Sequence, residues 1–231
     1  MLINGLQKLT LLDFPGHVAC TVFTGGCNLR CPFCHNALLV TETEDLESYP
    51  EEDILAFLEK RRGVLDGIAL TGGEPLIQKG VREFIEKVRA LGYLVKLDTN
   101  GTRPEVLREL LTAGLLDYVA VDIKNSPEKY GETVGVPDFD ITPVRETVDM
   151  LIKGSVPYEF RTTVVREYHS EESIGKIGQW IAGAERYFLQ NFEDSGQLIG
   201  ENLHAHDKNT LRLMKETAEK YVKSVAIRGI D

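Results

Sequence analysis

The sequence lacks the features that mark exported, membrane-spanning or nucleic-acid-binding proteins. No apolar run approaches the roughly 20 residues that a membrane-spanning helix needs, and the N-terminus lacks the basic start and long apolar stretch of a signal peptide. The formal net charge is −10, and no dense cluster of lysine or arginine offsets it. Such a surface repels phosphate backbones. We therefore expect a cytoplasmic protein that binds neither membrane nor nucleic acid.

Cysteine is scarce, and nothing resembles a linker between domains. The chain has four cysteines among its 231 residues. In a reducing compartment, so few cysteines are more often metal ligands or redox groups than disulfide partners. Cys20 lies inside an aliphatic run and is expected to be buried. No Pro- or Ser-rich segment divides the chain, so the sequence predicts a single domain over residues 1–231.

What the sequence does contain is a regular alternation of short aliphatic runs and amphipathic stretches. The aliphatic runs predict strands at residues 17–24, 67–70, 94–97, 118–122, 158–165, 187–192 and 225–228. The amphipathic stretches predict helices at residues 51–61, 81–91, 104–112, 144–152, 172–181 and 208–222. Helical connections imply parallel strands. Because the chain falls short of eight such units, we expect an α/β fold, a partial, open TIM-like (β/α)6 barrel with parallel strands.

Polar and glycine-rich segments stand where these strands end. They are Gly25-Gly26-Cys27, Thr71-Gly72-Gly73-Glu74-Pro75, Asp98-Thr99-Asn100-Gly101, Asp122-Ile123-Lys124 and Gln190-Asn191, and Arg161 lies within the strand at 158–165. The carboxyl ends of parallel strands form the catalytic face of barrel-type α/β proteins. We therefore expect these segments to converge on one site.

Three of the cysteines, Cys27, Cys31 and Cys34, lie in one C-x3-C-x2-C segment. Thiolates this close can bind one metal centre, and iron–sulfur clusters are usually held by four of them. Three would leave one iron of a four-iron cluster open, as a catalytic metal requires. A structural zinc site that adds His35 is an alternative. Residues 31–35 also match the C-x-x-C-H haem attachment pattern, which would leave Cys27 and the strand-end motifs unexplained.

The cysteine segment, with an aromatic residue before its last cysteine, resembles that of the radical S-adenosylmethionine (SAM) superfamily. The Gly-Gly-Glu, Asp-Thr-Asn-Gly and Asp-x-Lys segments follow it in the order found in the activases of glycyl-radical enzymes. This resemblance covers about residues 5–191. It is strongest to the anaerobic ribonucleoside-triphosphate reductase activating proteins, and the pyruvate formate-lyase activating enzyme is similar as well.

The resemblance implies a chemistry that rests on cofactors, with no further catalytic residue. Cys27, Cys31 and Cys34 would hold a [4Fe–4S] cluster that SAM completes. Reduced flavodoxin or ferredoxin would supply an electron, SAM would be cleaved, and a glycyl radical would form on a partner enzyme. Alternatives are activation of pyruvate formate-lyase or another glycyl-radical enzyme, and a small-molecule radical SAM enzyme such as a deazapurine synthase. A zinc-binding or electron-transfer module without SAM activity is a further alternative.

The resemblance also assigns roles to single residues. SAM contacts are implied for Phe33, His35, Gly72, Gly73, Glu74, Asp98 and Arg161. A monovalent cation beside SAM would be held by Asp98, Thr99 and Asp122. Asp13 would contact the peptide of the partner, although Phe14 replaces the glycine that relatives carry after it. A strand-to-helix turn, a helix cap, an interior ion pair and a surface turn remain the plainer interpretations of these residues.

Overall fold

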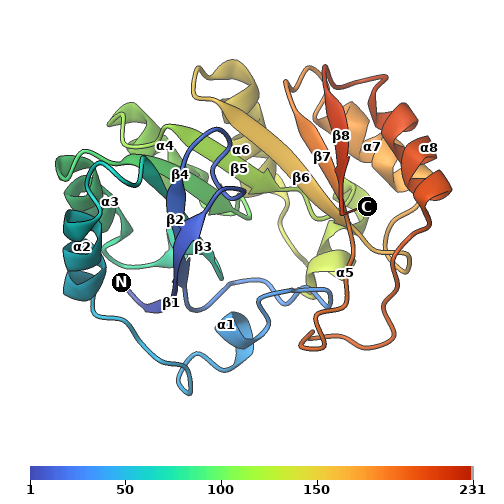
Figure 1. The fold of residues 1–231 in the computed structure, drawn as a ribbon. Helices are drawn as coiled ribbons and strands as arrows, with labels where there is room; N and C mark the ends of the chain where they lie inside the picture. The colour runs from blue at the N-terminus through green and yellow to red at the C-terminus, as the bar shows by residue number, and fades with distance from the viewer. Residues whose placement is uncertain (230–231) are drawn as a thin grey trace. The chain divides into compact units, whose positions relative to one another are not determined.

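The computed structural model describes residues 1–229 as an α/β fold built on one open sheet (Figure 1). The sheet has eight strands in the order β1-β2-β3-β4-β5-β6-β7-β8. Strands β2, β3 and β4 pair in parallel, as do β6, β7 and β8, whereas β1 runs antiparallel to β2. The predicted α/β class with an open, parallel sheet is confirmed. Strand β1 is an addition that the sequence did not predict.

The chain forms two compact units. Unit 1 comprises Met1–Asn28, Leu38–Thr99 and Glu105–Val119. Its strands are β1 (Ile3–Thr10), β2 (Ala19–Thr24), β3 (Gly67–Gly72), β4 (Leu94–Thr99) and the start of β5 (Tyr118–Asp122). Its helices are α1 (Leu38–Thr41), α2 (Glu51–Lys60), the 3-10 helix η1 (Pro75–Ile77), α3 (Val81–Ala90) and most of α4 (Pro104–Thr112). Helix α2 packs on α3, and α3 packs on β4.

Unit 2 comprises Leu29–Ala37, Asn100–Pro104 and the chain from Ala120 onward. Its strands are the end of β5, β6 (Tyr158–Val164), β7 (Tyr187–Asn191) and β8 (Val225–Arg228). Its helices are η2 (Pro127–Lys129), α5 (Tyr130–Val134), α6 (Thr142–Lys153), α7 (Glu171–Trp180) and α8 (Lys208–Ala218). Helices α7 and α8 pack together, and α8 packs on β7 and β8. Among residues 1–229, no helix is both long and apolar enough to cross a membrane.

The first residues of helices α7 and α8 are set by their N-terminal caps. Helix α7 begins one residue earlier than predicted because Ser170 forms a capping box with Ser173. Helix α8 begins where predicted, since the carboxylate of Asp207 accepts hydrogen bonds from the first backbone N–H groups. It ends at Ala218, not at 222, and the chain then turns so that the backbone N–H of Lys223 donates to the carbonyl of Ala184.

A hydrophobic cluster closes the N-terminal ends of the strands in unit 1. Phe14 is 2% exposed and packs with Ala19 and Tyr118, and Leu94 lies against them. A Cβ at Gly67 would stand 3.0 Å from the Phe14 ring. Because these four neighbours are the first residues of β2, β5, β4 and β3, Phe14 forms a floor for unit 1 at the end away from the strand-end motifs.

Candidate functional site

One of the four cysteines lies within β2 and the other three follow that strand; Cys31 is buried, and Cys27 and Cys34 are partly exposed. None forms a disulfide. Cys20 is fully buried in β2, and burial raises the pKa of its thiol to about 12, so it supplies no thiolate. Within residues 1–229, no three His, Cys, Asp or Glu side chains converge on the position of a single metal ion. Cys27, Cys31 and Cys34 lie close together in sequence and carry the soft sulfur donors that iron–sulfur clusters use, and their role as cluster ligands stays a prediction.

In unit 1, the glycines of the Gly-Gly-Glu motif pack directly against the backbone of the residues just before Cys27. Gly72 has a φ of +116°, and a Cβ there would lie 2.4 Å from backbone atoms of Thr24. A Cβ at Gly73 would lie 1.9 Å from the carbonyl oxygen of Gly26. The N–H of Gly73 donates to the Thr24 carbonyl at 2.8 Å. Only glycine permits this approach, so the motif sets the position of the residue before Cys27.

Glu74, the third residue of the motif, is completely buried in unit 1. Its backbone N–H donates to the Gly26 carbonyl at 2.8 Å. Its carboxylate caps η1 by accepting from the N–H of Leu76 at 3.0 Å, and it accepts from the hydroxyl of Thr99 at 2.7 Å. The carboxylate is therefore fixed in orientation, and its contact with the amino group of SAM stays a prediction.

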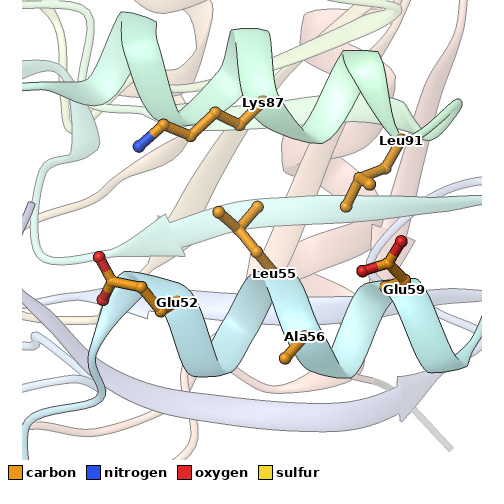
Figure 2. Close-up of a pocket in the computed structure, with 6 residues that line it drawn as sticks. All are labelled: Glu52, Leu55, Ala56, Glu59, Lys87 and Leu91. Atoms are coloured by element: carbon orange, nitrogen blue, oxygen red, sulfur yellow. The ribbon is translucent and has the colours of Figure 1, made fainter.

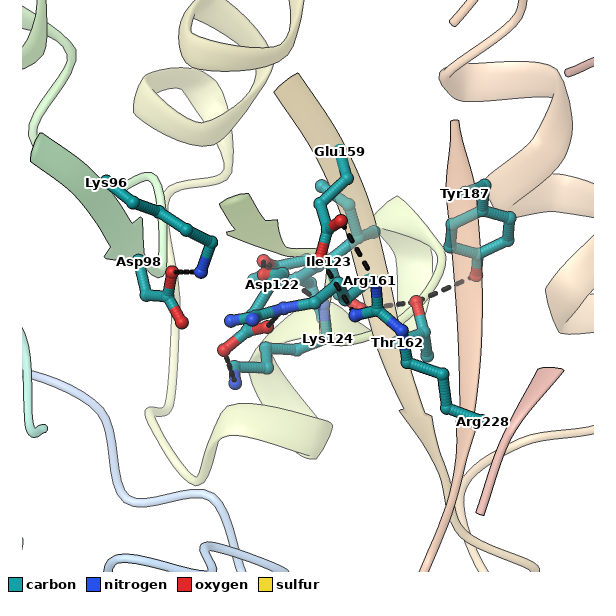
Figure 3. Close-up of polar contacts among 11 residues, drawn as sticks. Lys96, Asp98, Asp122, Ile123, Lys124, Glu159, Arg161, Thr162, Tyr187 and Arg228 are labelled. Atoms are coloured by element: carbon teal, nitrogen blue, oxygen red, sulfur yellow. Dashed lines mark hydrogen bonds and ion pairs between the residues drawn. The ribbon is translucent and has the colours of Figure 1, made fainter. Parts of the chain in front are cut away.

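Strand β4 carries a buried lysine beside a predicted site residue. Lys96 is 2% exposed, and its ammonium pairs with the carboxylate of Asp98, two residues along the same strand (Figure 3). The hydroxyl hydrogen of Thr99 points to Glu74. Both predicted cation ligands of unit 1 thus have protein partners, so an added cation at Asp98 would face an ammonium already in place.

Asp13 lies in the turn between β1 and β2. Its carboxylate accepts a hydrogen bond from the hydroxyl of Thr21, and its backbone N–H donates to Thr10 Oγ1 at 3.2 Å. These bonds fix the turn and orient the carboxylate. Its contact with a partner peptide stays a prediction.

In unit 2, the turn at residues 31–35, called the cysteine turn below, is hydrogen-bonded to the loop between β7 and α8. The N–H of Cys34 donates to the Cys31 carbonyl at 3.1 Å, which closes the turn. The Pro32 carbonyl accepts from the N–H of Gly200 at 2.7 Å. A Cβ at Gly200 would stand 2.6 Å from Pro32 Cβ, so the close approach depends on glycine.

The aromatic residues of the cysteine turn also have fixed neighbours in unit 2. Phe33 is 3% exposed, and its ring centroid lies 5.7 Å from that of Tyr168 and 6.0 Å from that of His169. The ring of His35 stacks on Phe192 with centroids 6.0 Å apart. Phe33 therefore anchors the turn in the core of this unit. The predicted proximity of Phe33 and His35 to SAM stays a prediction.

Asp122, at the end of β5 in unit 2, lies between two cations (Figure 3). Arg161 Nε donates to one carboxylate oxygen at 2.9 Å, and Lys124 Nζ donates to the other at 3.2 Å. Burial on its own would raise the pKa of this carboxyl, but the two opposite charges outweigh it and hold the pKa well below its usual value. Asp122 is therefore ionised at neutral pH, and the three residues act as one charged group.

Four residues that support these groups escaped the sequence analysis: Lys96, His169, Phe192 and Gly200. Of these four, only Lys96 could have been identified from the sequence, because a lysine inside the aliphatic run 94–97 is expected to be buried and would then need a partner of opposite charge. His169 is 2% exposed, and burial lowers its pKa to about 4, so its neutral ring braces Phe33. The others touch residues far away in sequence, and no local pattern marks them.

A surface groove between α2 and α3 is unrelated to these residues (Figure 2). Leu55, Ala56 and Leu91 line it, and Glu52, Glu59 and Lys87 stand along it. None of the residues predicted for cluster or SAM binding lies there.

Comparison with known proteins places the chain in a family. The sequence profile of the Radical SAM superfamily matches residues 21–181. A Methanocaldococcus jannaschii protein, provisionally named a glycyl-radical enzyme activating enzyme, is 34% identical over 236 residues, which cover 100% of this chain and 97% of that protein. The 7-carboxy-7-deazaguanine synthase of Methanopyrus kandleri is 33% identical over 130 residues, covering 48% of this chain and 51% of that enzyme.

A solved structure shares the fold. A domain of pyruvate-formate lyase-activating enzyme from Bacteroides vulgatus superposes with a TM-score of 0.58 at 16% identity, covering 71% of this chain and 99% of that domain. The family match runs from Thr21 to Ile181 and includes the cysteine segment, the Gly-Gly-Glu motif, Asp122 and Arg161. The resemblance inferred from these motifs is confirmed, and the chain belongs to the radical SAM superfamily.

Proposed function

We propose that this protein is an activating enzyme that generates a glycyl radical on a partner enzyme, and that the partner is an anaerobic ribonucleoside-triphosphate reductase. The observation that carries the proposal is the match along the whole chain to the provisionally named activating enzyme, at 34% identity and 97% of its length. The match to the deazaguanine synthase covers only 51% of that enzyme. That match covers 48% of this chain, whereas the match to the activating enzyme covers 100% of it.

The cofactors are those of the superfamily, a [4Fe–4S] cluster and SAM. We assign the cluster to Cys27, Cys31 and Cys34, whose sulfur donors fit it, and leave its fourth iron to SAM. When bound, the cluster and SAM together would supply the one-electron chemistry that removes a hydrogen atom from glycine. The protein's own contribution is to bind, orient and shield these groups.

Each assigned residue has a task that its surroundings support. Glu74, fixed by Thr99 and the N–H of Leu76, would hold the amino group of SAM. Gly72 and Gly73 keep the backbone before Cys27 in place.

The remaining assignments concern SAM and the partner. Phe33 and His35 would lie along the adenine, and Arg161, ionised and oriented by Asp122, would contact the SAM carboxylate or ribose. Asp98 would lie near the SAM carboxylate, and Asp13 would contact the partner peptide. We propose reduced flavodoxin or ferredoxin as the electron donor and the cytoplasm as the compartment.

The test is radical formation on a candidate partner. The anaerobically reconstituted, reduced protein is incubated with SAM and the reductase, and the glycyl signal is recorded by electron paramagnetic resonance. We expect the doublet of a glycyl radical with the wild-type protein and none with Cys27→Ala, which removes a proposed ligand. Cys20→Ala serves as the matched cysteine control and is expected to retain the signal.

A second function has an observation in its favour, the half-length match to a small-molecule synthase. If SAM is consumed catalytically with a purine-type metabolite in the absence of any partner protein, that function is correct and the activase proposal is wrong. A signal with pyruvate formate-lyase but not with the reductase would keep the activase class and change the target.

A further inference from the structure

The ammonium of Lys96 is a positive charge buried inside unit 1. The side chain is 2% exposed and pairs with Asp98, whose side chain is 14% exposed (Figure 3). Residues two apart on a strand point to the same face, so the pair is built into β4 itself. An ammonium removed from water is costly unless it is paired, so its position beside Asp98 is maintained by the fold.

The same carboxylate is where the family resemblance places a monovalent cation. Within unit 1, such an ion would need oxygen donors from Asp98 and Thr99. Asp98 already faces the Lys96 ammonium, and the Thr99 hydroxyl donates to Glu74. A free cation does not fit this set, because it would compete with charges that the protein supplies.

We propose that Lys96 is a positioning residue that replaces the monovalent cation: its ammonium supplies the positive charge beside Asp98, and SAM binds without added K⁺ or Na⁺. The inference rests on the proposed function, in which SAM places its carboxylate near Asp98. Two carboxylates close together repel each other, and a cation beside them relieves that repulsion.

A tethered ammonium has two physical advantages over a free ion in this position. It loses no translational freedom when SAM binds, because it is part of the fold. It is also a compact charge with three hydrogen-bond donors, so it can serve two oxygen acceptors at once. SAM affinity should therefore be independent of the alkali ion in solution.

The first experiment uses the cluster-loaded wild-type protein. The dissociation constant of SAM is measured by isothermal titration calorimetry in choline chloride, NaCl and KCl at equal ionic strength. We expect the three values to agree within about twofold, since choline is too large to act as a ligand of a small oxygen site. Tighter binding in KCl by more than about fivefold would overturn the inference and leave the proposed function intact.

Variants of Lys96 provide the second test. In choline chloride, Lys96→Ala should weaken SAM binding by about tenfold or more, because the positive charge that Lys96 places beside Asp98 is removed. KCl should restore much of that affinity, since the shortened side chain leaves room for an ion. Lys96→Met fills the same space without charge and should stay weak in both salts. Lys8→Ala, at an exposed lysine of β1, is the control and should behave as wild type.

A third measurement needs neither cluster nor SAM. The melting temperature of the cluster-free protein should be equal in choline chloride and KCl for the wild type, whereas Lys96→Ala should be stabilised by KCl alone. Failure of Lys96→Ala to respond to KCl in both binding and melting would overturn the inference. Absence of SAM binding by the loaded wild type in every salt would overturn the proposed function and the inference together.

Discussion

The contact between Gly73 and the carbonyl of Gly26 makes a sharp prediction for Gly73→Ala. The added Cβ would lie 1.9 Å from that oxygen, against a lower limit of 3.0 Å for real Cβ contacts, so the backbones must separate by 1.1 Å. Both partners are backbone, and no side chain can swing away to relieve the clash. Overpacking of this kind costs about 1 to 3 kcal/mol. Since Gly26 precedes Cys27, we expect the displacement to reach Cys27, the first of the proposed cluster ligands.

Two measurements on Gly73→Ala check this reasoning. The cluster-free protein should melt lower than wild type by about 2 to 4 °C for each kcal/mol lost. After anaerobic reconstitution and gel filtration, iron and sulfide per chain should fall well below the wild-type values. The matched control is Gly63→Ala, where φ is +75° and a Cβ meets nothing within 4 Å. It should cost about 1 kcal/mol or slightly more through backbone strain and leave the iron content unchanged.

The outcome that refutes the reasoning is equally definite. If Gly73→Ala keeps both the wild-type melting temperature and its full iron content, the contact with Gly26 does not set the position of Cys27. If Gly63→Ala loses as much iron as Gly73→Ala, general destabilisation and not the local clash explains the loss.

Three further predictions concern other parts of the chain. Arg161→Met should lower the free energy of unfolding by about 1 to 2 kcal/mol at pH 7, because Asp122 loses one of its two cations. The pKa of Asp122 is depressed in the folded state, so this stabilisation is present above the pKa of an unfolded carboxyl and is lost as pH falls through the folded-state pKa. The difference in unfolding free energy between wild type and variant, measured by urea unfolding, should therefore shrink below about pH 4. A difference that stays constant with pH would contradict the assignment. Phe14→Ala should lower the free energy of unfolding, measured by urea unfolding, by about 3 to 5 kcal/mol, because it leaves a cavity in the hydrophobic cluster of unit 1. A loss below about 1 kcal/mol would show that Phe14 is not packed as described. Cys20→Ala should retain the wild-type iron content after reconstitution, whereas Cys27→Ala should lose most of it, and equal loss in both would make Cys20 a ligand.

The predicted strands lie close to the observed ones because each depended on an uninterrupted aliphatic run. Residues 118–122 coincide with β5, and the predicted strand at 67–70 begins where β3 begins. Strand β1 was missed for a physical reason. Asn4 and Gly5 are poor strand formers, and the strand is held by pairing with β2 and not by its own pattern.

The motifs of the candidate site could be identified from the sequence, but the hydrogen bonds that connect them to other segments could not. The spacing of the cysteines and the position of Gly-Gly-Glu at a strand end are local features. That Thr99 bonds Glu74, or that Gly200 bonds Pro32, depends on which distant segments the fold brings together. Asp98 shows the limit well. The family resemblance implied a cation ligand at this position, and only the structure shows that the ammonium of Lys96 lies beside the carboxylate.

The contacts that hold the cysteine turn in unit 2 determine when, during synthesis of the chain, the turn can reach its native surroundings. The turn at residues 31–35 leaves the ribosome early, but the partners that hold it, Tyr168, Phe192 and Gly200, are made more than a hundred residues later. Chains are synthesised from the N-terminus at about 5 to 20 residues per second, so for several seconds the cysteines lack their native surroundings. The native surroundings of the turn at residues 31–35 are therefore complete only after most of the chain has been made.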